Sequence, residues 1–331
     1  MNTDLSTEIC GIKLKNPIIV TPGPLTRDGE AIQRAAKNGA AAAIIRSIGM
    51  EGGKDPEPCF APLNGGILNA TTFSDLGLDE WIKKEFSKAK KAGIPVIGSI
   101  FVPRGKATAS EYLELAQKVG EAGVDMLHIV TNYVILSYDE AREIVKAVKR
   151  ACDLPICVNL NYTDNIDVVG EKMKKAGADA ALAVDAPWAM KIDVGTGMPV
   201  LGSPDGTGHL SGRPMHPLAV YSVYKLTRKV DLPLIGSTGV SSGEDAIELM
   251  MAGAKAVGLQ SALILGGDET IPRVIDEIKE ILEKQKIRSI KDIIGKTVRL
   301  VKSRTEKELK YHRNGNCSLQ EMRKILGSTQ G

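Results

Sequence analysis

The chain has 331 residues, which suits one large domain, and 43% of them are hydrophobic, enough for a substantial core. Its formal net charge is only +3, and basic and acidic residues are mixed, which argues against a nucleic-acid-binding protein. No apolar run reaches the length of about 18 residues that spans a membrane, and the N-terminus does not resemble a signal peptide. Five cysteines without a Cys-x-x-Cys pair indicate a reducing compartment, the cytoplasm, and argue against a zinc or iron–sulfur site. The four histidines also lack metal-ligand spacing, so we expect no metal.

Eight short apolar runs recur along the chain and end in small or polar residues. They are near-continuous rather than alternating, which is typical of parallel strands buried on both faces. In chain order these predicted strands are residues 17–23, 41–47, 95–101, 126–132, 155–161, 180–186, 233–239 and 256–262. The amphipathic stretches between them predict helices at residues 30–38, 78–92, 109–122, 138–152, 166–176, 217–229 and 243–252.

The repeated order of strand and helix predicts a parallel α/β fold, and eight repeats over roughly 250 residues predict a closed (β/α)8 TIM barrel. An open doubly wound sheet is the alternative. Residues 5–14 predict an N-terminal β-hairpin that turns at Cys10-Gly11 and plugs the barrel bottom. We assign residues 1–296 to the barrel and 297–331 to a C-terminal helical extension. The basic segment from Ile287 onward is expected to have no role in the barrel.

Two of the connections, residues 47–95 and 186–233, are longer than a helical crossover requires. Long loops at the C-terminal face of a barrel usually build or cover the site. The last two predicted strands end in small-residue turns, at residues 236–239 and 258–261, and the first turn leads into a helix. Backbone N–H groups and a helix N-terminus would converge there, which predicts a phosphate site. For any one of these glycines, a tight turn without a ligand is the alternative.

Several segments, taken in order, resemble the dihydroorotate dehydrogenases. They are LSTEICGIKLKNP at 5–17, MPVL at 198–201, GHLSGRPMHPLA at 208–219, the two turn regions at 236–245 and 253–262, and RSIKDIIG at 288–295. The resemblance covers residues 5–296. The flavin domain of dihydropyrimidine dehydrogenase belongs to the same family and fits about as well. Each motif alone is only moderately specific, whereas their order and spacing are highly specific.

The resemblance implies an FMN-dependent oxidoreductase acting on CH–CH bonds, with pyrimidine metabolism and a homodimer as family expectations. The FMN phosphate would lie on the two turns, and the flavin ring would lie across the strand ends. The cofactor-binding residues implied in this way are Pro22, Gly23, Arg46, Ser47, Asn159, Gly212, Gly236, Thr238, Gly239, Gln260 and Ser261. Because the chain has no dinucleotide or iron–sulfur module, reoxidation would need an electron-transfer partner protein or a diffusible acceptor.

The substrate side departs from the family pattern. After the fourth strand the family has a Cys or Ser base, whereas here Tyr133 follows Asn132 in a shortened loop. Asn159 replaces a family Lys on the fifth strand, and Asp185 replaces an Asn on the sixth. Arg46 replaces a Lys after the second strand, which keeps the charge but changes its geometry.

We therefore expect Tyr133, Asn132 and Asp185 to be catalytic. Substrate binding is expected at Asn69, which matches a family Asn, and at His209 in a Gly-rich loop. Because Asp185 would repel the orotate carboxylate, the substrate is expected to be a small cyclic molecule other than dihydroorotate.

Purely structural roles stay open for single residues: Tyr133 could pack over the flavin edge, and Asp185 could make a loop hydrogen bond. For His128, a place in the core is the favoured interpretation. Two other functions also stay open. One is a non-redox barrel enzyme acting on a phosphorylated substrate, although no strand ends in the lysine that a Schiff base would need. The other is a non-catalytic flavin-binding barrel.

Overall fold

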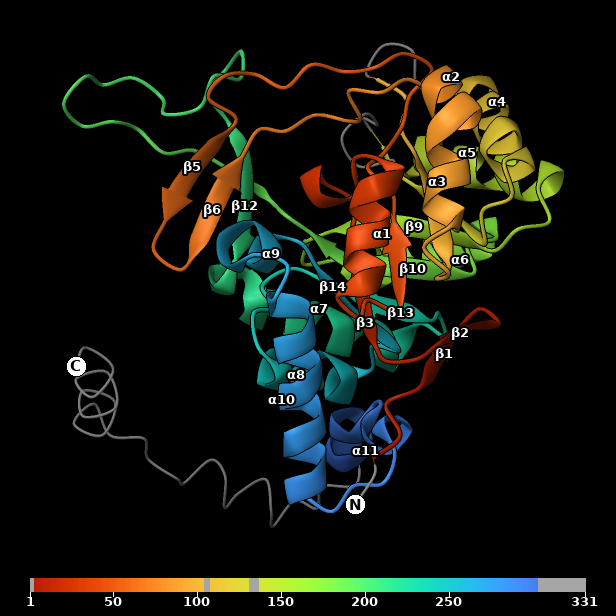
Figure 1. The fold of residues 1–331 in the computed structure, drawn as a ribbon, viewed down its shortest axis with the longest axis vertical. Coiled ribbons are helices and arrows are strands. Elements are labelled where there is room, and N and C mark those ends of the chain that lie inside the picture. Colours follow the sequence, from red (N-terminus) through yellow and green to blue (C-terminus); the bar gives the residue numbers. More distant parts are fainter. Residues whose placement is uncertain (1–2, 104–107, 131–136, 303–331) are drawn as a thin grey trace.

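The structure is a computed structural model that describes residues 3–103, 108–130 and 137–302. Eight parallel strands form a closed barrel in the order β10-β13-β14-β3-β4-β7-β8-β9 (Figure 1). Their bounds are β3 (Ile18–Val20), β4 (Ala42–Ile44), β7 (Val96–Ile100), β8 (Met126–Ile129), β9 (Ile156–Asn161), β10 (Ala180–Asp185), β13 (Leu234–Gly236) and β14 (Ala256–Leu259). The predicted (β/α)8 barrel is confirmed, and the open sheet is excluded.

Helices surround this barrel and follow the predicted stretches closely. They are α1 (Gly29–Lys37), α2 (Leu78–Glu80), α3 (Phe86–Lys90), α4 (Ala109–Glu121), α5 (Tyr138–Ala151), α6 (Ile166–Ala176), α7 (His216–Lys229), α8 (Gly243–Ala252), α9 (Ser261–Gly266), α10 (Thr270–Lys284) and α11 (Lys296–Lys302). A π-helical turn, Trp81–Glu85, joins α2 to α3. Local caps set the ends: Thr108 and Glu111 form a capping box at α4, and left-handed Gly177 ends α6.

The predicted hairpin is formed by β1 (Thr7–Ile9) and β2 (Ile12–Leu14). Cys10 and Gly11 both have positive φ, 49° and 81°, as a two-residue turn of this kind requires. Ile9 and Leu14 are buried and belong to the cluster of apolar side chains that fills the barrel. The hairpin therefore closes one end of the barrel, and the active face must lie at the other.

The two long connections build a second, antiparallel sheet in the order β11-β12-β6-β5. Its strands are β5 (Phe60–Leu63), β6 (Gly66–Asn69), β11 (Trp188–Ala189) and β12 (Gly208–Gly212), and Figure 1 shows β5, β6 and β12 beside the barrel. In its register His209 lies opposite Asn69. This sheet was not predicted, although the two loops were expected to contribute to the site.

The segment after Ile287 does pack on the barrel helices, so the expectation that it has no role there is wrong. The 3-10 turn Ile290–Ile293 buries both of its isoleucines in the main core. The Ile290 N–H donates to the Asp4 carbonyl, and the Gly295 N–H donates to the Met250 carbonyl, each at 2.9 Å. The sequence analysis overlooked this packing because the segment is rich in basic residues. The two buried isoleucines, Ile290 and Ile293, are three positions apart. No helix in the described part is long and apolar enough to cross a membrane.

Candidate functional site

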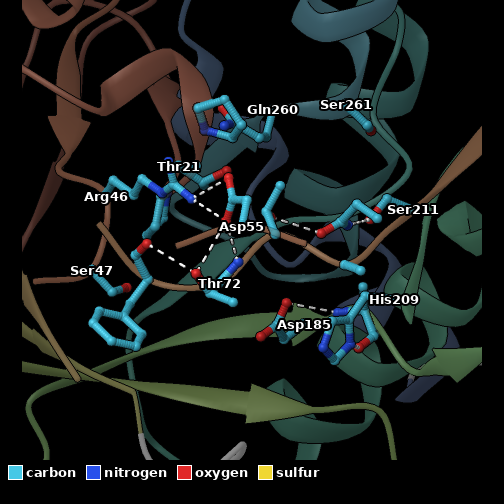
Figure 2. A pocket seen from close by; sticks show the side chains of 18 of the residues that line it. Thr21, Arg46, Ser47, Asp55, Thr72, Asp185, His209, Ser211, Gln260 and Ser261 are labelled. Carbon is cyan, nitrogen blue, oxygen red and sulfur yellow. Dashed lines mark hydrogen bonds and ion pairs between the residues drawn. The ribbon is translucent and has the colours of Figure 1, made fainter. Parts of the chain in front are cut away.

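The C-terminal ends of the barrel strands open into a cavity of about 980 Å³, a size suited to a cofactor together with a small ligand. The second sheet forms one of its walls, because Asn69 of β6 and His209 of β12 both line it. Figure 2 shows Gln260 and Ser261 on one side of the cavity and Asp185 and His209 on the other. The predicted residues that line it are Pro22, Gly23, Arg46, Ser47, Asn69, Asn159, Asp185, His209, Thr238, Gly239, Gln260 and Ser261.

Two predicted residues, Gly212 and Gly236, are not part of the cavity lining. A Cβ on Gly212 would lie 2.6 Å from the Gly66 Cα, so this glycine lets β12 approach β6 closely. A Cβ on Gly236 would lie 3.0 Å from the Ala254 Cβ, in the packing between strand and helix. Gly212 and Gly236 therefore allow close packing of the strands and helices around the cavity. Asn132 and Tyr133 lie outside the described residues.

The end of the cavity near β14 contains polar groups without partners. The Gln260 side chain has both its Nε2 and its Oε1 buried, and neither has a hydrogen-bond partner in the described part of the chain. A Cβ on Gly23 would overlap the Gln260 Nε2, so only glycine leaves room for this amide. Within the same described ranges, the N–H groups of Gly239 and Ser261 have no acceptor either. Buried polar groups of this kind need a ligand or water to compensate them.

The N-terminus of α8, by contrast, is already occupied by carboxylates of the protein. Asp245 accepts from the N–H groups of Ser241 and Ser242 at 2.8 and 3.0 Å. Glu277 accepts from the Gly243 N–H at 2.6 Å. Burial works to raise the pKa of Asp245, but the hydrogen bonds from Ser241 and Ser242, together with nearby His216, hold it below the usual value. These three N–H groups of the α8 N-terminus are therefore already bonded within the protein, and the predicted phosphate site is left with the turn amides as its candidate donors.

Arg46 follows β4, lines the cavity and is only 6% exposed. Carboxylates of the protein compensate its positive charge. Its Nη2 lies 2.8 Å from both carboxylate oxygens of Asp55 (Figure 2). Its Nη1 lies 3.4 Å from Asp75. Asp55 also accepts from the Thr72 N–H at 2.7 Å. Burial works to raise the pKa of Asp55, but the bond from Thr72 and the Arg46 guanidinium lower it below its ordinary value.

The floor of the cavity carries Asn159 and Asp185 from the neighbouring strands β9 and β10. The Asn159 Nδ2 donates to Asp185 Oδ2 at 2.6 Å, and the Ala186 N–H donates to Oδ1 at 2.8 Å. Beside them, His128 of β8 is 1% exposed and also lines the cavity. Its Nδ1 lies 2.8 Å from the Ser99 Oγ. Burial lowers the pKa of His128 to about 4, against an opposing effect of Asp185.

His209 is held at the edge of this floor. Its Nδ1 lies 3.0 Å from the Ala186 carbonyl oxygen, and its ring centroid lies 4.1 Å from that of Trp188. Burial lowers the pKa of His209, and the nearby Asp185 carboxylate only partly opposes this. The lowered pKa keeps the imidazole neutral near pH 7, and these contacts orient it within the cavity.

A family model described as dihydroorotate dehydrogenase matches residues 4–282 of the chain. The chain belongs to the dihydroorotate dehydrogenase family. Three relatives are named as the catalytic subunit of dihydroorotate dehydrogenase B (NAD(+)). Those from Thermoplasma acidophilum, Methanocaldococcus jannaschii and Methanocella arvoryzae are 32%, 34% and 35% identical over 308, 312 and 302 residues. The alignments cover 89%, 88% and 88% of this chain and 99%, 97% and 97% of those proteins.

Family membership confirms the predicted class, an FMN-dependent oxidoreductase acting on CH–CH bonds. The sequence analysis missed four residues that lie next to predicted site residues. Asp55 and Asp75 form ion pairs with Arg46, and Ser99 and His128 lie beside Asn159. Only His128 carried a signal in the sequence, since a histidine near the C-terminal end of a barrel strand is placed to face the site.

Proposed function

We propose that this chain transfers a hydride between FMN and a small cyclic substrate that lacks a carboxylate, and that dihydroorotate is not its preferred substrate. The observation that carries the proposal is the charge of the cavity. Of the described residues, four carboxylates and two cations line it: Asp55, Glu57, Asp185, Asp205, Arg46 and Lys54. Arg46 is paired with Asp55 and Asp75, and Lys54 is exposed at the rim. An anionic ring bound at the floor would therefore meet Asp185 with no compensating cation from the part of the chain that the structure describes.

The residues near β14 fit FMN. A phosphate accepts hydrogen bonds, and the N–H groups of Gly239 and Ser261 and the Gln260 amide are the donors without partners at this end. Glycine at position 23 leaves room for the Gln260 amide, one of these donors. When bound, FMN supplies the site that accepts or donates the hydride. These residues bind and orient, and they exclude water from the strand ends.

The floor residues act on the substrate. Asp185 already accepts from Asn159 and Ala186, and its remaining lone pairs can accept an N–H of the substrate ring. Neutral His209 can hydrogen-bond the ring through its Nε2, because its Nδ1 faces the Ala186 carbonyl. Asn69 lies opposite His209 in the second sheet and is the other substrate-binding candidate. The proton that accompanies the hydride is assigned to the loop carrying Asn132 and Tyr133.

Reoxidation needs an acceptor that this chain does not carry. Because the relatives are named as catalytic subunits of NAD(+)-linked enzymes, we infer that a partner subunit passes the electrons on. A diffusible acceptor is the alternative, and a homodimer is the expected assembly of the chain itself. Purification from the native host with the chain as bait tests this, since a stoichiometric flavoprotein or iron–sulfur partner is the expected result.

The first experiment is the visible absorption spectrum of the purified protein, with identification of any flavin released on denaturation. A yellow protein that releases FMN supports the cofactor. A colourless protein that also fails to bind added FMN would overturn the proposal and favour the enzyme acting on a phosphorylated substrate.

The substrate is then tested with a matched pair, dihydrouracil and dihydroorotate, which differ only in one carboxylate. Under anaerobic conditions we expect dihydrouracil to bleach the flavin faster. Asp185→Asn should shift the preference toward dihydroorotate by about tenfold or more, because it removes the repelling charge. Faster bleaching of the parent protein by dihydroorotate would show that the carboxylate is accommodated.

A further inference from the structure

One row of side chains crosses all four strands of the second sheet and faces the cavity. Trp188 lies opposite His209 in the register of the sheet, and His209 lies opposite Asn69. Asn69 in turn lies opposite Phe60. Residues paired in this way project from the same face of a sheet, and all four line the cavity. The row therefore has two hydrogen-bonding side chains in its middle and an aromatic side chain at each end.

The two faces of this sheet differ in how much apolar surface they expose. On the face away from the row, Ala61 of β5 and Leu68 of β6 are 4% and 1% exposed and form a small core with Leu201. On the cavity face, Phe60 is 36% exposed and Trp188 is 61% exposed. Large apolar side chains that stay accessible inside a ligand cavity indicate a ligand with apolar surface of its own.

The row is also too long for a bare six-membered ring. Neighbouring strands lie roughly 4.8 Å apart, so four side chains in a row extend over about 14 Å. A six-membered ring contacts two such neighbours, and a ring held between His209 and Asn69 reaches neither aromatic end. Trp188 is the end next to the cavity floor, because it follows Asp185 by three residues and pairs with His209.

We propose that Trp188 is a specificity-determining residue, which stacks on a planar, apolar group attached to the substrate ring. The substrate class is then a polar ring that carries an aryl substituent, with the ring between His209 and Asn69 and the substituent on the indole. The inference rests on the proposed function for the place of the ring, and it adds the chemical class of the substrate.

The indole is held in place before any ligand binds. Its ring centroid lies 4.1 Å from that of His209, with the two planes 39° apart. The backbone around it is fixed as well, since the Leu210 N–H donates to the Pro187 carbonyl at 2.9 Å. A side chain that is ordered in advance loses little conformational entropy on binding, so more of the stacking energy contributes to affinity.

Uracil, 5-benzyluracil and 6-benzyluracil test the substituent site by calorimetric titration of the full chain as purified. The three share the polar ring, and the two isomers carry the phenyl group on different sides of it. We expect at least one benzyl compound to bind about tenfold more tightly than uracil, the effect of one aromatic contact. If neither binds more tightly than uracil, or if none of the three binds, the proposal is overturned.

Variants assign this preference to Trp188. Trp188→Ala should reduce the ratio of the two dissociation constants to about one, whereas Trp188→Phe should keep most of it, because phenylalanine can still stack. Tyr221→Ala is the matched control, since Tyr221 is 49% exposed on α7 and lies outside the cavity lining. It should keep the full ratio. General damage to the fold would weaken all ligands alike, so a ratio that persists in Trp188→Ala, or one that is lost in Phe60→Ala instead, would overturn the proposal.

Fluorescence locates the phenyl group in the parent protein, because the chain has only two tryptophans. Trp81 is 0% exposed, so acrylamide should quench mainly Trp188. A saturating concentration of the tighter benzyl compound should reduce this quenching about twofold, since a stacked ring covers one of the two faces of the indole. Unchanged quenching with the compound bound would also overturn the proposal.

The FMN content of the same samples separates this inference from the proposed function. A parent protein without FMN that still prefers the benzyl compound, and loses the preference in Trp188→Ala, would refute the redox function and support the role of Trp188. A protein that holds FMN but shows no preference would leave the redox function standing and refute this role.

Discussion

The two ends of the cavity differ in how the protein satisfies their polar groups. Near β14, in the described part of the chain, the Gln260 amide and the N–H groups of Gly239 and Ser261 have no protein partner. At the floor, Asp185 accepts from Asn159 and Ala186, and His128 Nδ1 lies 2.8 Å from the Ser99 Oγ, although His128 Nε2 has no partner among the described residues. The β14 end therefore lacks hydrogen-bond partners that a ligand must supply. At the floor, hydrogen bonds within the protein orient Asp185 before a ligand binds. Cofactor binding and substrate choice can therefore be disturbed separately.

The floor should make the protein sensitive to mild acid. The pKa of His128 is about 4 in the folded protein, whereas the ordinary value for histidine is 6.5, so the unfolded chain binds more protons between these values. Stability is therefore complete above the unfolded pKa and falls as the pH drops from 6.5 toward 4. The loss amounts to roughly 3 kcal/mol, at 1.36 kcal/mol per pKa unit. Urea unfolding at several pH values measures it.

His128→Gln should remove this part of the pH dependence, because glutamine does not titrate. The parent and the variant are compared at each pH, so contributions of other groups, including His209, cancel in the difference. Equal losses of stability in both proteins on going from neutral to acid pH would show that His128 is not held neutral by burial.

At the β14 end, Gly23→Ala should impair FMN binding with little effect on folding. The new Cβ would overlap the Gln260 Nε2, the far end of a flexible side chain, so the glutamine moves and the fold persists. We expect FMN affinity to fall about hundredfold, equivalent to two hydrogen bonds to the ligand. Fluorescence titration of the apoprotein measures it. Gly195→Ala, where the nearest atom to the new Cβ is 3.4 Å away, is the control and should bind as the parent does.

Gln260→Leu should have opposite effects on stability and on binding. In the apoprotein it removes two buried polar atoms that lack partners, so the free energy of unfolding should rise by about 1 kcal/mol. FMN affinity should fall about tenfold, since the same atoms are donor and acceptor for the ligand. Asn159→Leu at the floor is the contrast, because it removes the hydrogen bond that Asn159 donates to the Asp185 carboxylate and should lower stability. A less stable Gln260→Leu apoprotein would contradict the distinction between the two ends.

The sequence predicted the parts of this molecule that have a repeating pattern. Apolar runs identified all eight barrel strands, and their order placed Gly239 and Gln260 at one edge. Contacts between distant segments have no such pattern. The two residues of β11 are too few to be recognised, and Asp55 reaches Arg46 from a loop without periodicity. His128 was taken as a core residue because an apolar strand surrounds it, although its ring lines the cavity.

The smallest effect is expected at the ion pair that compensates Arg46. The pKa of Asp55 is lowered from 3.8, so the pair adds stability above that pH, and this is lost as the pH falls through the lower, folded value. Asp55→Asn should cost about 1 kcal/mol near neutral pH, a modest figure because the Asp55 side chain is 28% exposed. Asp75→Asn, at 3.4 Å and 54% exposed, should cost less. Thermal melts at neutral pH and near pH 3 measure both, and the Asp55→Asn deficit should shrink in acid. If Asp55→Asn remains less stable than the parent near pH 3, Asp55 would stabilise the protein through the conformation of its loop. Its ion pair with Arg46 would then not be the cause.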